Sequence, residues 1–394
     1  MACPWRISWP ETILPTTTTH NKRNLWLDMT KGACCAAIVW HHLAFYGPMS
    51  DVAAQVTPGI IEWLAEYARI AVQIFLVMGG FLSAASLAPQ GVARFGSPLA
   101  KIGQRALRLL APYSVALLLA VLIAALVRPW FAHESVPAEP TWQQLIANAL
   151  MLQDISGEDA LSAGVWYVAI DFQLFAAVTL LFAFSRRWPR QWLGLQLGQW
   201  VVLAMTALSL LVLNRHSELD MWFVYFIGAY GMGMLAFWGS QSAKPWSWTA
   251  ALLALGLLSL EVDFRLRIAV ALCGAVALLW LMRVPSDSRL VDWLGRQAPV
   301  RWLQSLGQMG YSVFLVHFSI VVLCNAVVSH VWPSQPWLNW LGMGLAFALS
   351  LLAGRALYLG VEARTPSLRS VARWELGLVG AGLLVSLVGA RLSM

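Results

Sequence analysis

Long apolar stretches separated by short polar connections make up most of this 394-residue sequence. Because a helix that crosses a membrane needs about 20 mostly apolar residues, this pattern predicts a bundle of membrane-crossing helices. Eleven segments fit: Gly32–Gly47, Arg69–Ala88, Ala106–Val127, Gly164–Phe184, Leu193–Leu213, Met221–Phe237, Trp248–Leu260, Ile268–Met282, Met309–Trp332, Trp337–Val361 and Leu376–Leu392. The seventh and eighth are short, because charged residues between 261 and 267 interrupt a longer apolar region. We therefore predict an all-α polytopic membrane protein.

The composition excludes a soluble globular protein. Hydrophobic residues make up 59% of the chain and charged residues only 11%, whereas soluble domains carry about 25% charged residues. The first thirty residues are polar and lack the apolar core of a cleavable signal, so we expect the first helix to remain as an anchor. The cysteines have neither metal-ligand spacing nor the pattern of a disulfide framework; they are Cys3, Cys34, Cys35, Cys273 and Cys324.

Lysine and arginine are unequally shared between the two sets of connections. With the N-terminus in the cytoplasm, most of the 26 basic residues fall on cytoplasmic connections, as the orientation rule for membrane proteins requires. Orientation therefore explains the net charge of +7 better than nucleic-acid binding does. Segment 283–308 is then cytoplasmic. The acidic, proline-rich segment 129–162 is outside, where we expect a partly ordered loop over the outer mouth. Eleven crossings place the C-terminus outside.

Two ionisable positions on the first helix carry the main chemical signal. Lys31 and His42 are eleven residues apart, so they return to within roughly 20° of the same helix face and stand ~16 Å apart. His41 is offset by about 80° from Lys31 and is the weaker candidate. Ionisable groups inside a membrane are costly and are functional suspects by default. The alternative is that both histidines lie in the headgroup zone as snorkelling polar residues.

Two further residues fall near the expected depth of His42. Counting from the helix ends, His42 lies roughly 8 Å below the outer surface and Asp171 ~10 Å below it. Arg69 opens the second helix on the same side. We expect these three to meet in an outer pocket, where Asp171 would orient and charge the imidazole of His42.

Basic residues near the inner surface suggest a second site. Arg105 and Arg108 are three residues apart on one helix face and, with Lys31 and Lys101, form a candidate phosphate clamp. The simpler interpretation of this pair is positive-inside anchoring. His317 on the ninth segment is most simply a packing residue, and Tyr311 is a candidate partner in its hydrogen-bond network.

Near the inner end of the tenth segment, Glu362 and Arg364 most simply form a surface pair. Phosphate ligands inside, with a histidine base ~16 Å away across the bilayer, describe a substrate with a charged phosphate head and a long thin arm. Acyl-coenzyme A has this shape.

Six segments, in chain order, resemble motifs of the acyltransferase-3 family of integral membrane acyltransferases. They are Asp28–His42, Phe75–Leu82, Arg105–Pro112, Trp166–Phe175, Gly307–His317 and Glu362–Pro366. Three positions depart from the family pattern: Lys31 stands for Arg, Gly79 for Ser and Asp171 for Glu. Lysine keeps the charge of arginine but loses its bidentate geometry.

The resemblance implies a ten-helix catalytic domain over residues 28–366, preceded by a polar cytoplasmic segment (1–27) and followed by a C-terminal transmembrane helix (367–394). Some relatives carry a soluble esterase-like domain after this helix, which we do not expect here. The implied activity is acyl transfer, most simply O-acetylation, from cytoplasmic acyl-CoA (acetyl-CoA) to a hydroxyl of a saccharide or glycolipid at the outer face of the cell membrane. Neither a metal, a resident cofactor nor a nucleic acid is expected.

In this interpretation His42 removes the acceptor proton as general base or carries the acyl group transiently. Asp171 orients His42, and Arg69 binds the acceptor or stabilises the oxyanion. Lys31, Arg105 and Arg108 hold the donor phosphates, and His41, His317, Tyr311 and Glu362 are further candidates. Two alternatives remain open: a transporter or lipid-linked-sugar translocase, and a catalytically silent relative that binds a partner.

Overall fold

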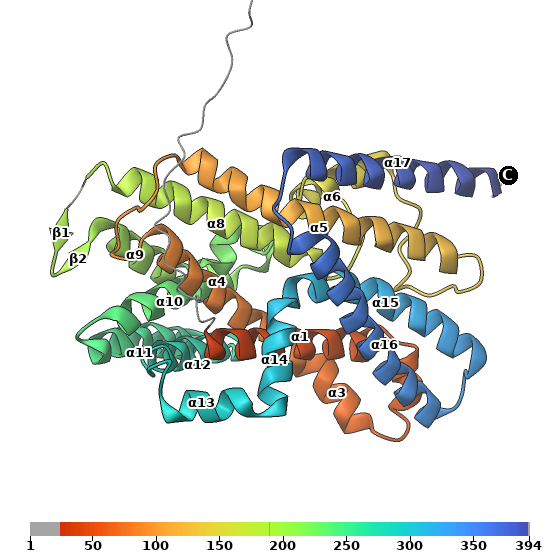
Figure 1. Ribbon diagram of the computed structural model, residues 1–394, viewed down its shortest axis with the longest axis horizontal. Coiled ribbons are helices and arrows are strands. Elements are labelled where there is room, and N and C mark those ends of the chain that lie inside the picture. Colours follow the sequence, from red (N-terminus) through yellow and green to blue (C-terminus); the bar gives the residue numbers. More distant parts are fainter. Residues whose placement is uncertain (1–23, 189, 393–394) are drawn as a thin grey trace, which may run out of the picture.

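A computed structural model describes residues 24–188 and 190–392 of the chain, and these residues are almost entirely helical (Figure 1). In chain order the elements are α1 (Leu25–Phe45), α2 (Met49–Ala53), α3 (Pro58–Tyr67), η1 (Ala68–Ile70), α4 (Ala71–Leu87), α5 (Pro98–Val127), α6 (Trp142–Ala149), α7 (Gln153–Ser156), α8 (Val165–Ser185), β1 (Gln191–Trp192), β2 (Leu195–Gln196), α9 (Leu197–Leu211), η2 (Leu213–Arg215), η3 (Ser217–Leu219), α10 (Phe223–Gln241), α11 (Pro245–Val262), α12 (Leu266–Leu281), α13 (Arg289–Arg296), α14 (Ala298–Gln308), α15 (Gly310–Val331), α16 (Pro336–Leu357), η4 (Tyr358–Glu362) and α17 (Leu368–Leu392). Most of the polar N-terminal segment predicted over 1–27, including Cys3, lies outside the described residues.

The predicted all-α, polytopic architecture is confirmed. Each of the eleven apolar segments coincides with a helix: α1, α4, α5, α8, α9, α10, α11, α12, α15, α16 and α17. Within the described ranges, nine helices are long and apolar enough to cross a membrane. The other two are α12, which has only 16 residues, and α1, which carries Asp28, Lys31 and two histidines.

Two regions differ from the sequence prediction. The second crossing segment begins earlier than expected, because α3, η1 and α4 form one continuous helical stretch over Pro58–Leu87. The connection expected to be a loop over 129–162 contains α6 and α7. At the start of α6, Thr141 and Gln144 form a reciprocal capping box, which satisfies backbone donors that a short helix would otherwise leave unpaired.

Helix α10 lies at the centre of the largest hydrophobic cluster and packs on α4 at backbone distance. A side chain at Gly233 would overlap the carbonyl of Val77, and one at Gly80 would overlap the carbonyl of Tyr230. Small residues at such crossings let two helices approach closely, which is how helices associate in membranes without a hydrophobic driving force.

Helix α1 is held at both ends by different elements. Its first turns pack against α14, where a side chain at Gly32 would overlap the carbonyl of Leu303 and one at Gly307 would overlap that of Asp28. Its C-terminal half contacts α3 and α15. The position of α1 is therefore fixed along its length, and with it the positions of Lys31 and His42.

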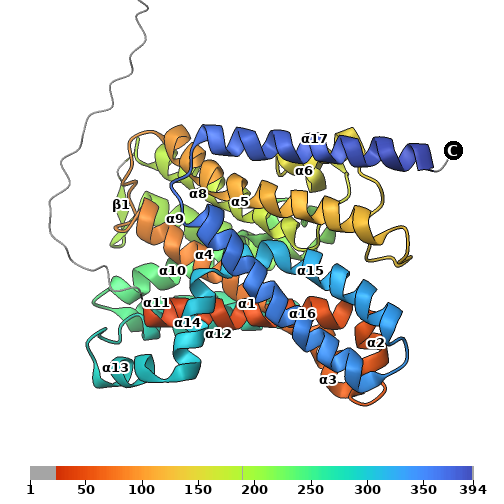
Figure 2. The same ribbon diagram turned by 45° about the vertical axis from the view of Figure 1, so that its right-hand side comes forward.

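The eleventh helix, α17, runs beside α5 with α6 close to it (Figures 1 and 2). The Ser114 hydroxyl donates to Glu375 Oε1 at 2.6 Å, and the Ser386 hydroxyl donates to the carbonyl of Pro140. Further along, a side chain at Gly382 would overlap Leu145 of α6. These contacts attach α17 to the helices that precede it.

Candidate functional site

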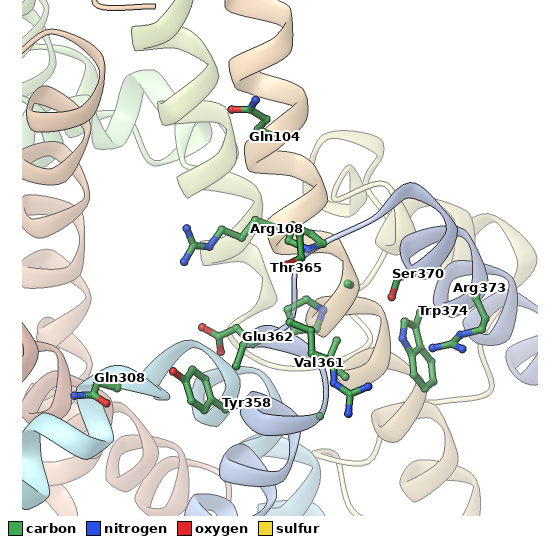
Figure 3. Close-up of a pocket in the computed structure, with 16 residues that line it drawn as sticks. Gln104, Arg108, Gln308, Tyr358, Val361, Glu362, Thr365, Ser370, Arg373 and Trp374 are labelled. Carbon is green, nitrogen blue, oxygen red and sulfur yellow. The ribbon is translucent and has the colours of Figure 1, made fainter. Parts of the chain in front are cut away.

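Two cavities lie toward opposite ends of α1. The larger, of about 1110 Å³, adjoins the C-terminal end of α1 and is lined by His41, His42 and Arg69 together with aromatic residues and the loop 157–164. We call it the histidine cavity. The smaller, of about 620 Å³, is lined by Arg108, Glu362 and neighbouring residues (Figure 3), and we call it the arginine cavity. The arginine cavity is within the usual size range of ligand-binding sites in proteins, and the histidine cavity is slightly larger than that range.

A hydrogen-bonded chain of two histidines forms one wall of the histidine cavity. His42 Nδ1 lies 2.5 Å from His317 Nε2, although the two residues are 275 positions apart in the sequence. The rings stack with centroids 4.8 Å apart and an interplanar angle of 14°. His317 Nδ1 lies in turn 2.7 Å from the carbonyl oxygen of Phe314. Both histidines are buried.

The hydrogen bonds that link His42, His317 and Phe314 determine the tautomers of the two neutral imidazole rings. A carbonyl oxygen only accepts hydrogen bonds, so His317 Nδ1 carries the proton and donates it to Phe314. His317 Nε2 is then an acceptor, and His42 Nδ1 must donate to it. The remaining nitrogen of His42, Nε2, is left with a free lone pair. His42 is therefore held in the form that a base or nucleophile requires.

Helix α8 begins directly beside this pair. Its N-cap residue, Gly164, has φ +85°, and a Cβ there would lie 3.2 Å from the ring of Phe314 and 3.6 Å from Cε1 of His42. Only glycine adopts this left-handed conformation at no steric cost. The first turn of α8 is thus level with His42.

The pairing predicted between Asp171 and His42 is not present. Asp171 instead forms an ion pair with Arg105 of α5, and the Arg105 guanidinium also lies 5.4 Å from the ring centroid of Phe175, one turn further along α8. The reason is the level at which α8 starts. Because Gly164 is beside His42, Asp171, seven residues later, lies about 10 Å deeper.

The same ion pair changes the expected role of Arg105, whose charge is matched by Asp171 rather than left available for a phosphate. Around the pair, Tyr230 donates to or accepts from Ser83 at 2.6 Å, and a Cβ at Gly79 would lie 3.0 Å from the Tyr230 ring and 3.5 Å from Asp171 Oδ1. The position where the family pattern has serine thus faces the Asp171 carboxylate.

Arg108 and Glu362 line the arginine cavity, and Lys31 lies near Glu362. Both cations lie close enough to act electrostatically on Glu362, and Arg108 and Glu362 extend toward a shared space in Figure 3. Glu362 Oε2 accepts a hydrogen bond of 2.5 Å from the Ser312 hydroxyl. The expected surface pair of Glu362 with Arg364 is absent from the ion pairs of the described residues. Of the three predicted phosphate ligands, Arg108 lines this cavity, Lys31 is near enough to act on Glu362, and Arg105 is paired with Asp171.

The remaining candidates take less central positions. Arg69 is exposed at the histidine cavity, and its Nε donates to the carbonyl of Glu66 at 3.2 Å. His41 Nδ1 lies 3.4 Å from the carbonyl of Leu64. Tyr311 does not join the histidine network, because its hydroxyl donates to the carbonyl of Leu109 at 3.0 Å.

Sequence reasoning missed several residues. Arg364, Arg373 and Trp374 line the arginine cavity, and Tyr230 contacts the region of the ion pair. The three arginines at 364, 369 and 373 are the signal in the sequence that could have found this wall. Among the residues that the structure describes, there is no group of three or more His, Cys, Asp or Glu side chains placed to hold a metal ion.

Fold and site together define a polytopic membrane protein with a histidine at one end of a buried helix and a basic cavity at the other. The family model of the acyltransferase domain matches residues 24–359, well over half of the chain. The chain belongs to the acyltransferase-3 family. Comparison with curated proteins and with solved structures gives no match.

Proposed function

We propose that this protein transfers an acyl group, most simply acetyl, from coenzyme A in the arginine cavity to a hydroxyl of a saccharide or glycolipid in the histidine cavity. The observation that carries the proposal is the chain from His42 through His317 to the carbonyl of Phe314. Family membership supports acyl transfer as the reaction.

The hydrogen bonds from His42 through His317 to Phe314 suit His42 for general base catalysis. His42 Nε2 takes the proton of the acceptor hydroxyl, and the resulting oxygen nucleophile attacks the thioester carbonyl. The C–S bond breaks, the ester C–O bond remains, and the proton on His42 Nε2 passes to the departing thiolate to give free coenzyme A. Throughout, His317 accepts from His42 Nδ1 and keeps the ring in one orientation. The same lone pair would also serve in direct attack on the thioester: the C–S bond breaks, the thiolate leaves, and the acceptor hydroxyl then attacks the transient acyl-histidine, giving its proton to the thiolate and restoring the free imidazole.

The donor has to extend from one cavity to the other. Its phosphates suit Lys31 and Arg108, since charge-assisted hydrogen bonds to phosphate are the strongest that these side chains make. Lys31 and His42 are ~16 Å apart along α1, so a long thin arm is needed to bring the thioester to the base. The ion pair of Arg105 and Asp171 lies between these levels, and we assign it a positioning role for α5 and α8.

The lining of the histidine cavity suits a saccharide acceptor. Aromatic side chains, including Trp166 and Tyr225, offer faces on which a sugar ring can pack, while Arg69 and Asp220 offer hydrogen bonds to its hydroxyls. Arg69 is also placed to stabilise the negative oxygen of the transition state. Lysine and arginine sidedness supports an orientation in which the arginine cavity faces the cytoplasm and the histidine cavity faces outside, with the N-terminus cytoplasmic and the C-terminus outside the cell membrane.

Release of free coenzyme A from acetyl-CoA by the purified full chain in detergent tests the proposal, with water in place of the acceptor. His42→Ala should abolish release while leaving acetyl-CoA binding nearly intact. The exposed His216, which pairs with Glu218 and lines neither cavity, provides the matched control as His216→Ala. Arg108→Ala should raise the donor KM roughly ten- to a hundredfold, because one charge-assisted contact is lost.

Two outcomes would overturn the proposal. A translocase would neither bind nor turn over acetyl-CoA, and a silent relative would bind it without turnover. Wild-type release by His42→Ala would leave coenzyme A as donor but remove His42 as the base.

A further inference from the structure

One wall of the arginine cavity is built by a segment beyond the matched family domain. The family match ends at residue 359, whereas Arg364, Thr365, Ser370, Arg373 and Trp374 all line the cavity. These residues come from the connection after η4 and from the first turns of α17. The site is therefore completed by the eleventh helix.

The cavity has an excess of unpaired positive charge. Arg108, Arg364 and Arg373 have no carboxylate within 4 Å anywhere in residues 24–188 and 190–392. Among the described residues, Glu362 is the one acidic residue in the lining, and its carboxylate accepts a hydrogen bond from the Ser312 hydroxyl. A concave surface lined by arginine forks and hydroxyl groups is suited to a phosphate, because guanidinium groups bind its oxygens in pairs.

An aromatic surface lies next to these arginines. The Arg373 guanidinium is 5.1 Å from the ring centroid of Trp374, and in Figure 3 both side chains lie near Ser370, on the other side of Thr365 from Glu362. Any nucleobase can stack on such a ring, because every base has a π-face. A phosphate site beside an indole ring is suited to a phosphorylated nucleoside.

The position of this wall is fixed by the contact between α17 and α5. Glu375, directly after Trp374, accepts the 2.6 Å hydrogen bond from Ser114. Ser114 lies six residues beyond Arg108 on α5. The two sides of the cavity are thus joined close to the residues that line it, and binding would require little ordering of the protein.

We propose that Arg364, Arg373 and Trp374 form a subsite for the 3′-phosphorylated nucleoside of a coenzyme A donor. This inference rests on the proposed function and deepens it. Lys31 and Arg108 serve the phosphates nearer to the thioester arm, while the subsite holds the nucleotide end. A lipid headgroup is the other source of phosphate that could reach these arginines.

Binding of coenzyme A and of dephospho-coenzyme A, which lacks only the 3′-phosphate, tests this assignment by calorimetry on the purified full chain. Wild type should bind coenzyme A about tenfold more tightly, the effect of one charge-assisted contact. Arg373→Ala should weaken coenzyme A binding about tenfold and leave dephospho-coenzyme A unchanged, so that the preference disappears. Arg369→Ala provides the control, because Arg369 is exposed on the same helix and does not line the cavity.

The outcomes separate this inference from the proposed function. If wild type bound neither compound, the proposed donor would be wrong. If wild type bound both equally, or Arg373→Ala kept the preference, coenzyme A would remain the donor and the subsite would be rejected. The subsite would also be rejected in favour of a lipid headgroup if two results came together. Wild type would bind the two nucleotides with equal affinity, and phosphatidylglycerol in nanodiscs would compete with them in wild type but not in Arg373→Ala.

Discussion

Removal of His317 tests the hydrogen-bonded chain most directly. In His317→Ala, the Nδ1–H of His42 loses its acceptor at a buried position. An unsatisfied buried donor costs about 1–3 kcal/mol, and His42 can avoid this cost by moving its proton to Nε2. That change occupies the lone pair needed for catalysis. Since 1.36 kcal/mol corresponds to tenfold, we expect kcat to fall about 5- to 150-fold.

A conservative variant distinguishes positioning from packing. The amide oxygen of glutamine accepts from His42 Nδ1 as the imidazole nitrogen does, so His317→Gln should recover part of kcat. The donor KM should stay at the wild-type value in both variants, because the arginine cavity lies toward the other end of α1. Acetyl-CoA kinetics with melting temperatures recorded in parallel provide the measurement. Wild-type kcat in His317→Ala, or equal kcat in the alanine and glutamine variants at equal melting temperature, would refute the reasoning.

Three further predictions follow from local geometry. Gly164→Ala should lower the melting temperature and also reduce kcat, whereas Gly194→Ala should lower only the melting temperature, by the roughly 1–2 kcal/mol cost of a left-handed residue. Both glycines have positive φ, but Gly194 lines neither cavity and a Cβ there meets nothing within 4 Å. Equal kcat in the two variants would argue against close packing at His42. Burial raises the pKa of the Asp154 carboxyl above its ordinary value near 3.8, so the folded state holds this proton more tightly than the unfolded state does. Stability therefore falls as the pH rises from about 3.8 through the raised pKa of the folded state. Asp154→Asn should therefore melt higher than wild type at neutral pH and equally at pH 3.5, and a constant difference across this range would contradict the shift. Cysteine at Ser156 should react with an impermeant maleimide in intact cells and cysteine at Ser286 should not, in a background without other reactive cysteines; the reverse pattern would invert the proposed orientation.

The sequence determined the secondary structure class and the positions of the apolar helices, because the cost of burying polar groups in lipid depends on local composition. All eleven apolar runs became helices. It also predicted Lys31 and Arg108 as ligands of one phosphate group, from helix periodicity and the side of the membrane, and both lie near enough to act on Glu362. The start of the helical stretch at α3 could not be predicted from the sequence, because Glu62 and Glu66 resemble a polar connection although they lie within the helix.

Only the tertiary structure decided which groups meet across helices. The partner of His42 is 275 residues away, and its identity depends on how α1 and α15 pack rather than on any local pattern. Asp171 was misplaced because depth was counted from helix ends that were assumed to be level. Helix α8 begins at the level of His42, so the Asp171 carboxylate lies deeper and pairs with Arg105 instead. Periodicity specifies the face of a helix, but the relative height of two helices is set by the side chains packed between them.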